Sequence, residues 1–134
     1  YRRLVSKLGL QDRVFFVGKI SDERLRLLYH ACHCLALPSV AHAEGFGMVL
    51  AEAMACGTPV VCTTAGGLAE VAGDATLTCD PDDIEGMAAS MARILADPEV
   101  RASLRARGLA RAARFSWEET ARRILTIYAS LGPR

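Results

Sequence analysis

The chain has 134 residues, of which 51% are hydrophobic and 23% charged. This length fits one compact domain that needs neither disulfides nor a metal to fold, and it is too short for a two-domain enzyme. The formal net charge of +1 excludes the strong positive field of a typical nucleic-acid-binding chain, and the hydrophobic content excludes intrinsic disorder. The chain opens Tyr1-Arg2-Arg3 without an initiator Met, so we expect a segment of something longer.

Charge is distributed unevenly along the chain. Residues 1–30 carry seven Lys or Arg against three acidic residues, and residues 93–134 carry nine Arg against four. The 62 residues between them, 31–92, hold eight acidic residues and no Lys or Arg. An anion bound by this middle segment must therefore be held by backbone N–H groups or by cations from elsewhere.

The pattern predicts alternating helices and strands in the first hundred residues. An amphipathic helix over 2–8 precedes a β-branched and aromatic run, 14–17, which indicates a buried strand. Ser21 or Asp22 can cap the next helix, and a second apolar strand covers 34–37. After the loop 39–47 we expect a helix over 48–56, a strand over 60–63, a short helix from 66 to 71 and a strand over 75–79.

The remainder is predicted to be helical to the end of the chain. Asp97-Pro98 is an N-cap followed by proline at the first helical position. Ser116 and Glu119 have the spacing of a capping box. Arg107, Arg111 and Arg114 recur on one face here, for which a solvated basic surface is preferred over nucleic-acid binding.

Apolar strands separated by helices predict an α/β fold, a Rossmann-like parallel sheet with helices on both faces and a helical C-terminal tail. We assign residues 1–97 to a partial Rossmann-like domain and 98–134 to helices continuous with it. Ligands of such sheets lie at the carboxyl ends of the strands, which selects the loops 18–21, 38–47 and 63–67. Sheet strands that precede this chain are expected, so one edge is predicted to be unpaired and prone to association.

The five cysteines are odd in number and show neither a CxxC pair nor zinc-ligand spacing. Free, mostly buried thiols in a reducing cytosol are the preferred interpretation. His30, Cys32 and His33 could form a ligand cluster, but surface or half-buried positions at a helix end are favoured because no further paired ligands follow.

The segment from Glu44 to Ala55 carries the clearest chemical signal. Gly45 and Gly47 precede a helix whose first turns lack positive side chains, so backbone N–H groups and the helix dipole favour a phosphate there. Glu52 lies about two turns in among apolar neighbours, which predicts a buried carboxylate that needs hydrogen-bond donors. Ribose hydroxyls could supply them, as could the protein itself, and spacing alone does not decide between the two.

One long run of this sequence resembles the donor-site signature of glycosyltransferase family 4. The run extends from Pro38-Ser39 through Glu44-Gly45-Phe46-Gly47 to Cys56-Gly57-Thr58-Pro59-Val60-Val61. That family comprises retaining, nucleotide-sugar-dependent enzymes with the GT-B fold of two Rossmann-like domains. The likeness extends to 13–18 upstream and to Gly66-Gly67-Leu68-Ala69-Glu70-Val71, Asp80-Pro81 and Phe115-Ser116-Trp117 downstream. Several motifs in order over the whole chain make the resemblance specific.

The resemblance implies roles for individual residues. Glu44 would be the catalytic residue, hydrogen-bonded to the donor sugar, and Glu52 would hold the ribose. The sugar and diphosphate would be bound by the backbone of five residues: Gly45, Phe46, Gly47, Met48 and Val49. Ile20 would meet the base, whereas Gly66, Gly67 and Glu70 are compatible with structural roles and His42 with solvent.

The intact protein implied by the resemblance is a bacterial, cytoplasmic hexosyltransferase, with peripheral association at the inner face of the membrane left open. It would transfer a sugar from a nucleotide-diphospho-sugar to an acceptor glycan, lipid or small molecule, without a metal or another cofactor. The family's basic pair and the acceptor-binding N-terminal domain would lie outside this chain, which alone would be inactive. A free-standing nucleotide-binding or interaction module without catalysis is the alternative.

Overall fold

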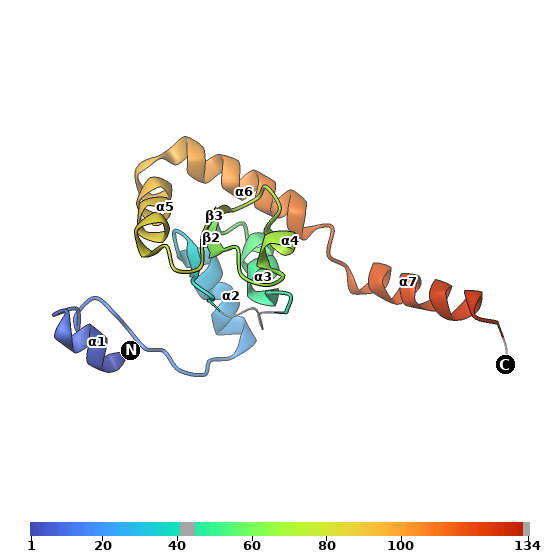
Figure 1. Cartoon of the computed structure of the whole chain (residues 1–134), viewed down its shortest axis with the longest axis horizontal. Helices are drawn as coiled ribbons and strands as arrows, with labels where there is room; N and C mark the ends of the chain where they lie inside the picture. The colour runs from blue at the N-terminus through green and yellow to red at the C-terminus, as the bar shows by residue number, and fades with distance from the viewer. Residues whose placement is uncertain (41–44, 133–134) are drawn as a thin grey trace.

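The computed structural model describes residues 1–40 and 45–132 of the chain. Its elements, in chain order, are α1 (Arg2–Lys7), α2 (Asp22–Ala31), β1 (Leu35–Leu37), α3 (Met48–Ala55), β2 (Val60–Thr63), α4 (Leu68–Ala72), β3 (Leu77–Cys79), α5 (Ile84–Ala96), α6 (Pro98–Ala112) and α7 (Trp117–Ser130). Figure 1 shows the sheet enclosed by helices, with α1 and α7 at opposite ends of the molecule.

The three described strands form one parallel sheet in the order β1-β2-β3. Val61, at the centre of β2, pairs with Ala36 of β1 and with Leu77 of β3. All four residues of β2 are buried, as expected for a strand with neighbours on both edges and helices on both faces. The predicted α/β fold with a parallel sheet is confirmed.

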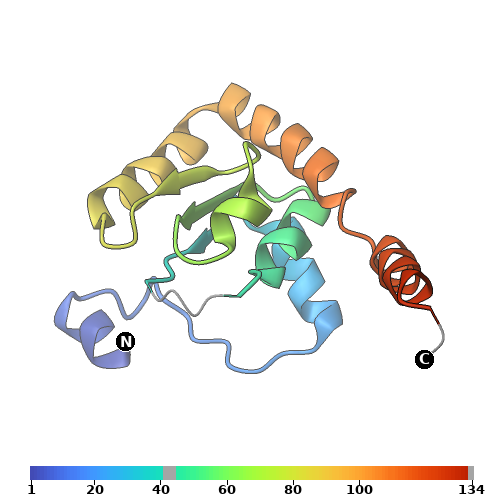
Figure 2. The same cartoon turned by 45° about the vertical axis from the view of Figure 1, so that its right-hand side comes forward.

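Alternate residues of β2 point into two separate cores. On one face, Val60 and Cys62 pack with Leu50, Met54 and other buried residues of α2, α3 and α4. On the other face, a smaller cluster gathers residues of α5 and α6 around the central strand: Val61, Met87, Ile94 and Leu104. The helices therefore cover both faces, as predicted, and Figure 2 shows α5 and α6 arching over one side of the sheet.

The predicted caps are confirmed at three helices. The Ser21 hydroxyl accepts from the backbone N–H of Arg24 at 3.4 Å at the start of α2. The Asp97 carboxylate accepts from two backbone N–H groups at the start of α6, and the Ser116 hydroxyl from that of Glu119 at 3.2 Å at the start of α7. Strand β3 is two residues shorter than predicted, because the N–H of Ala75 is bonded to the carbonyl of Ala72 in the preceding turn.

The prediction of a buried strand over 14–17 is wrong. The segment has no strand conformation, and the side chains of Phe15 and Val17 are 78% and 60% exposed. A strand needs a neighbour to satisfy its backbone groups, and β1 pairs within the described sheet only with β2. Without such a partner, the N–H of Val14 instead closes a turn onto the carbonyl of Leu10 at 3.1 Å.

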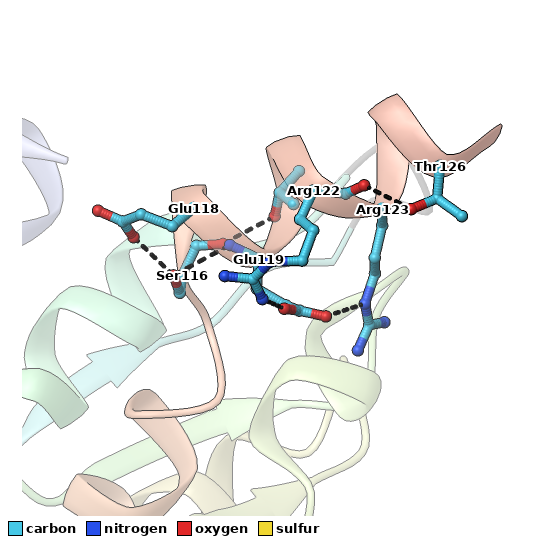
Figure 3. A network of polar contacts seen from close by, with 7 residues as sticks. Ser116, Glu118, Glu119, Arg122, Arg123 and Thr126 are labelled. Atoms are coloured by element: carbon cyan, nitrogen blue, oxygen red, sulfur yellow. Dashed lines mark hydrogen bonds and ion pairs between the residues drawn. The ribbon is translucent and has the colours of Figure 1, made fainter. Parts of the chain in front are cut away.

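The last helix, α7, has no buried residue and stands away from the body of the molecule in both views (Figures 1 and 2). Its polar contacts are local (Figure 3): the Ser116 hydroxyl donates to Glu118, and the Glu119 carboxylate accepts from Arg122 and from Arg123, the latter at 2.8 Å. The hydrogen bond from Ser116 lowers the pKa of Glu118. A capping box consists of two hydrogen bonds, one accepted by Ser116 and one accepted by the Glu119 carboxylate from the backbone N–H of Ser116. Among the described contacts only the first is made, because the Glu119 carboxylate binds the two arginines.

The cysteines are free but less buried than predicted. Cys62 is buried, Cys32 is exposed, and the other three, Cys34, Cys56 and Cys79, are intermediate. Burial raises the pKa of the Cys62 thiol. Within residues 1–40 and 45–132, no helix combines the length and apolar character needed to cross a membrane.

Candidate functional site

The carboxyl ends of the three strands lie together at one edge of the sheet, at Leu37, Thr63 and Cys79. The buried Thr63 hydroxyl donates to the backbone carbonyl of Ser39 at 2.5 Å, which ties the loop after β1 to the end of β2. Ligands of parallel α/β sheets bind at this edge. The loop that follows leads to Gly45 and the start of α3, the segment with the strongest sequence signal.

The segment 45–47 packs directly on the Gly66-Gly67 turn before α4. A Cβ atom at Gly67 would collide with the carbonyl oxygen of Gly45, and one at Gly47 would collide with Leu68. Gly47 also has a φ of 72°, in the left-handed region that favours glycine. The Gly66-Gly67 turn thus lies against the 45–47 segment, and the lack of side chains is what allows the close approach.

The N-terminus of α3 presents unbonded donors. The N–H of Leu50 bonds to the carbonyl of Gly47 at 2.9 Å, whereas the N–H groups of Met48 and Val49 have no partner among the described residues. No side chain of residues 1–40 or 45–132 caps this end of the helix. Free N–H groups at the positive end of a helix dipole suit a phosphate, as the sequence predicts.

Glu52 lies on the same helix, but the prediction that it is buried is wrong. The face of α3 that carries Leu50 and Met54 is buried, whereas Glu52 is exposed, and Met48 is 46% exposed. An eight-residue helix is covered only where neighbouring elements meet it, here mainly the sheet, α4 and α6, even when nearly all its residues are apolar. The carboxylate therefore faces outward, where a ligand can reach it.

The sequence left open whether the protein itself supplies a donor to Glu52, and it did not identify Tyr29 as that donor. The hydroxyl of Tyr29, on α2, donates to Glu52 Oε2 at 3.1 Å. Tyr29 is 7% exposed, and its burial, with the Glu52 hydrogen bond next in importance, raises its pKa to about 12. The available signal was a tyrosine on the apolar face of a helix, because a buried phenol requires a hydrogen-bond partner.

Ile20, predicted to meet the base, lies elsewhere. It lines a hollow of about 390 Å³ with Val17 and four residues of α2, and no residue of α3 lines that hollow. A second hollow, of about 280 Å³, lies at the carboxyl edge of the sheet between Thr63, Pro38 and Met87. The described residues thus bring Gly45–Val49 and Glu52 together at the start of α3 and on its second turn, but leave Ile20 outside this group.

Two predicted residues lie outside the described residues, namely Glu44 and His42. For the described ranges, no cluster of three or more His, Cys, Asp or Glu could hold a metal ion. The absence of a metal in the mechanism stays a prediction.

Arginines of α6 donate hydrogen bonds to backbone carbonyls. The prediction of a merely solvated basic surface is therefore corrected for Arg107 and Arg111. Arg107 donates to the carbonyl of Asp74 at 2.6 Å, and Arg111 to that of Val71 at 3.0 Å. Arg105 likewise donates to the carbonyl of Gly57 at 3.0 Å. These carbonyls belong to the segments that precede β2 and β3, so these three cations stabilise the fold there.

Comparison with known proteins identifies related sequences. Residues 1–111 match the family model described as "Glycosyl transferases group 1". An O-antigen chain mannosyltransferase B from Escherichia coli is 39% identical over 129 residues, covering 96% of this chain and 33% of the relative. A D-inositol 3-phosphate glycosyltransferase from Acidothermus cellulolyticus is also 39% identical, over 95% of this chain and 28% of its own length. The chain thus spans about a third of the length of these curated relatives.

Solved structures share the fold. A sucrose-phosphate synthase from Thermosynechococcus elongatus superimposes with a TM-score of 0.87 at 38% identity, over 97% of this chain and 33% of that one. The Anabaena protein HepE, solved in complex with UDP-glucose, gives a TM-score of 0.87 at 30% identity, over 96% of this chain and 35% of its own. The C-terminal domain of a Francisella tularensis group 1 protein, at 24% identity and a TM-score of 0.72 over 84% of this chain and 58% of that one, shares the fold.

Proposed function

The chain belongs to the glycosyl transferases group 1 family, and from this premise we propose that it is the donor-binding part of a glycosyltransferase that uses a nucleotide-diphospho-sugar. One observation carries the proposal: the N-terminus of α3, where the N–H groups of Met48 and Val49 have no partner among the described residues, is followed by the outward-facing Glu52 on the second turn. A phosphate at the helix end and a ribose beside the carboxylate are the two parts of a nucleotide diphosphate. A structure of the related HepE contains UDP-glucose, which supports this ligand class.

The roles proposed for the residues follow the same division. The backbone of Gly45–Val49 binds the sugar and diphosphate, because its two glycines permit close approach and its free N–H groups point along the helix axis. Glu52 binds the ribose hydroxyls. Glu44 is proposed to stabilise charge at the reacting carbon of the sugar. Ile20 is proposed to contact the base, reaching it from the segment beside α2.

We further propose the family 4 reaction, with retention at the anomeric carbon. The bond between that carbon and the diphosphate oxygen breaks as the acceptor oxygen bonds to the same face. The proton of the acceptor hydroxyl passes to the departing diphosphate. The protein then acts mainly through electrostatic stabilisation of the leaving group, for which the N–H donors of α3 are placed. No metal or cofactor is required in this scheme, and the cytoplasm is the proposed location.

The test uses the full-length protein, screened against UDP-, GDP- and ADP-sugars, with the anomer of the product determined by NMR. Glu52→Ala should reduce kcat/KM for the donor by roughly 10- to 100-fold, which corresponds to losing hydrogen bonds to a charged group. Glu85→Ala is the matched control, since Glu85 is an exposed glutamate at the start of another helix, α5.

Three results would count against the proposal or a part of it. Equal transfer rates for Glu52→Ala and Glu85→Ala would remove the ribose contact and with it the proposed site. A product of inverted configuration would overturn retention while leaving donor binding intact. Nucleotide binding without transfer to any acceptor would favour the alternative, a binding module without catalysis.

A further inference from the structure

Glu52 can serve a ligand only if its carboxylate is held in one orientation. Its side chain is exposed, and a free glutamate on a helix surface samples several rotamers. The Tyr29 hydroxyl restricts this freedom by donating to Oε2 at 3.1 Å. The other oxygen, Oε1, has no hydrogen-bond partner among the described side chains and backbone groups, so it is available to a ligand.

Tyr29 is itself rigidly placed, which makes it an effective anchor. Its ring belongs to the main core cluster with Leu50 and Met54. Its backbone carbonyl accepts from the buried Thr58 hydroxyl at 2.5 Å, and from the Cys32 thiol at 3.4 Å. Thr58 lies just after α3 in the chain, so its bond joins the end of α2 to the segment that follows α3. The Tyr29 hydroxyl makes a second bond, to Glu52 on α3 itself.

The phenol is also held in the state needed for donation. An ordinary phenol is already protonated in the neutral range, and burial moves the pKa of Tyr29 further from it, to about 12. A neutral phenol donates one hydrogen bond, and a carboxylate accepts with two oxygens that together offer about four lone-pair sites. One donor from the protein leaves enough acceptor sites for the two hydroxyls of a ribose.

We propose that Tyr29 is a positioning residue of the donor site: its hydroxyl holds the Glu52 carboxylate so that the remaining acceptor sites face the ribose diol of a nucleotide. This inference rests on the proposed function, because it takes Glu52 as the ribose ligand. It adds to that function a residue from α2 and makes ribose discrimination depend on a contact between two helices.

The experiment measures ribose discrimination in the full-length protein by calorimetry, with UDP, 2′-deoxy-UDP, GDP and 2′-deoxy-GDP as probes. We expect the wild-type protein to bind the ribonucleotide about tenfold more tightly than its 2′-deoxy form, the effect of one hydrogen bond to a charged group. Tyr29→Phe removes only the hydroxyl and should lower this ratio to about two- to threefold, mainly through weaker binding of the ribonucleotide. A purely structural role would weaken both nucleotides equally and leave the ratio unchanged.

Tyr128→Phe is the matched control, because Tyr128 is an exposed tyrosine on α7, and it should keep the wild-type ratio. Thr58→Val removes the hydroxyl that donates to the Tyr29 carbonyl, and it should lower the ratio of ribonucleotide to 2′-deoxynucleotide affinity by a smaller factor. This second variant keeps the proposal testable if Tyr29→Phe does not fold. An unchanged ratio in folded Tyr29→Phe, or in Thr58→Val should that variant alone fold, overturns the inference.

The inference and the proposed function can fail separately. If Glu52→Gln removes discrimination while folded Tyr29→Phe keeps it, Glu52 remains the ribose ligand and only the role of Tyr29 is lost. If the wild-type protein binds neither nucleotide, or binds ribo and deoxy forms equally, the proposed ribose site falls and the role of Tyr29 falls with it.

Discussion

At the scale of single residues, the geometry of the candidate site depends on where side chains are absent. Gly67 has an ordinary backbone conformation, with a φ of −79°, so conformational freedom does not explain this glycine. The reason is space, because a Cβ there would overlap the carbonyl oxygen of Gly45. Backbone cannot move aside as a flexible side chain can. Gly67 therefore fixes how closely the binding loop approaches α4.

We expect Gly67→Ala to displace the Gly45–Gly47 segment and to destabilise the protein by roughly 1–3 kcal/mol, the usual cost of overpacking. Donor KM should rise as the N–H groups of Met48 and Val49 move. Thermal unfolding and donor kinetics of the full-length protein measure the two effects.

Gly45→Ala is the control for stability in that experiment, since a Cβ at Gly45 meets no atom within 4 Å. Its unfolding temperature should stay close to that of the wild type. If Gly67→Ala were as stable as Gly45→Ala, the close contact between the two glycine segments would not exist in solution.

Local patterns predict some site residues well and others poorly. The glycines and unbonded N–H groups at the start of α3 follow from a few consecutive residues, so the sequence is sufficient to find them. The bond from Tyr29 to Glu52 joins residues 23 positions apart and exists only because α2 and α3 pack together. The exposure of Glu52 has the same origin, since it depends on which face of α3 the neighbouring elements cover.

At the scale of elements, α6 supports the connections that precede the strands. Arg111 donates from Nε to the carbonyl of Val71 and from its terminal nitrogen to that of Glu70, at the end of α4. A cation at the carboxyl end of a helix also interacts favourably with the helix dipole. The same guanidinium lies 5.3 Å from the centre of the Phe115 ring, which in turn packs edge-on against Phe46 at 5.4 Å. Arg111 thus links α4 to the binding loop.

Arg111→Ala should therefore lower the free energy of unfolding by about 1–3 kcal/mol, the range for hydrogen bonds made by a charged group. Arg114→Ala, an exposed arginine one turn further on, should stay within about 0.5 kcal/mol of the wild type. Denaturant unfolding of the two variants makes the comparison. Equal stabilities would show that the carbonyl contacts of Arg111 contribute nothing in solution.

Elements differ in how far the sequence determines them. The caps at Ser21, Asp97 and Ser116 involve neighbours two or three residues away, and all three form as predicted. Strand β2 is also found where predicted, because its apolar run is short and bounded by turn residues. The run 14–17 is also short and apolar but has no adjacent strand in the described sheet, and composition alone cannot supply one.

At the scale of the whole molecule, burial is concentrated at the centre and absent at both ends. Strand β2 is buried throughout, whereas α1 and α7 contain no buried residue. The exposed apolar residues of α7 include Trp117, Ile127 and Tyr128 at 76%, 59% and 67%. Since the chain spans about a third of its curated relatives, we expect these apolar surfaces to be covered in a longer protein.

Hydrogen exchange should show this gradient directly. In the 134-residue chain alone, amides of β2 should exchange only through global unfolding, because both edges of the strand are paired and both faces are covered. Amides of 14–17 and of α7 should exchange orders of magnitude faster, since few buried contacts oppose local opening. In the full-length protein the same two segments should become protected while β2 changes little. Protection of α7 equal to that of β2 in the chain alone would contradict the gradient, because it would require buried contacts that α7 does not make in this structure.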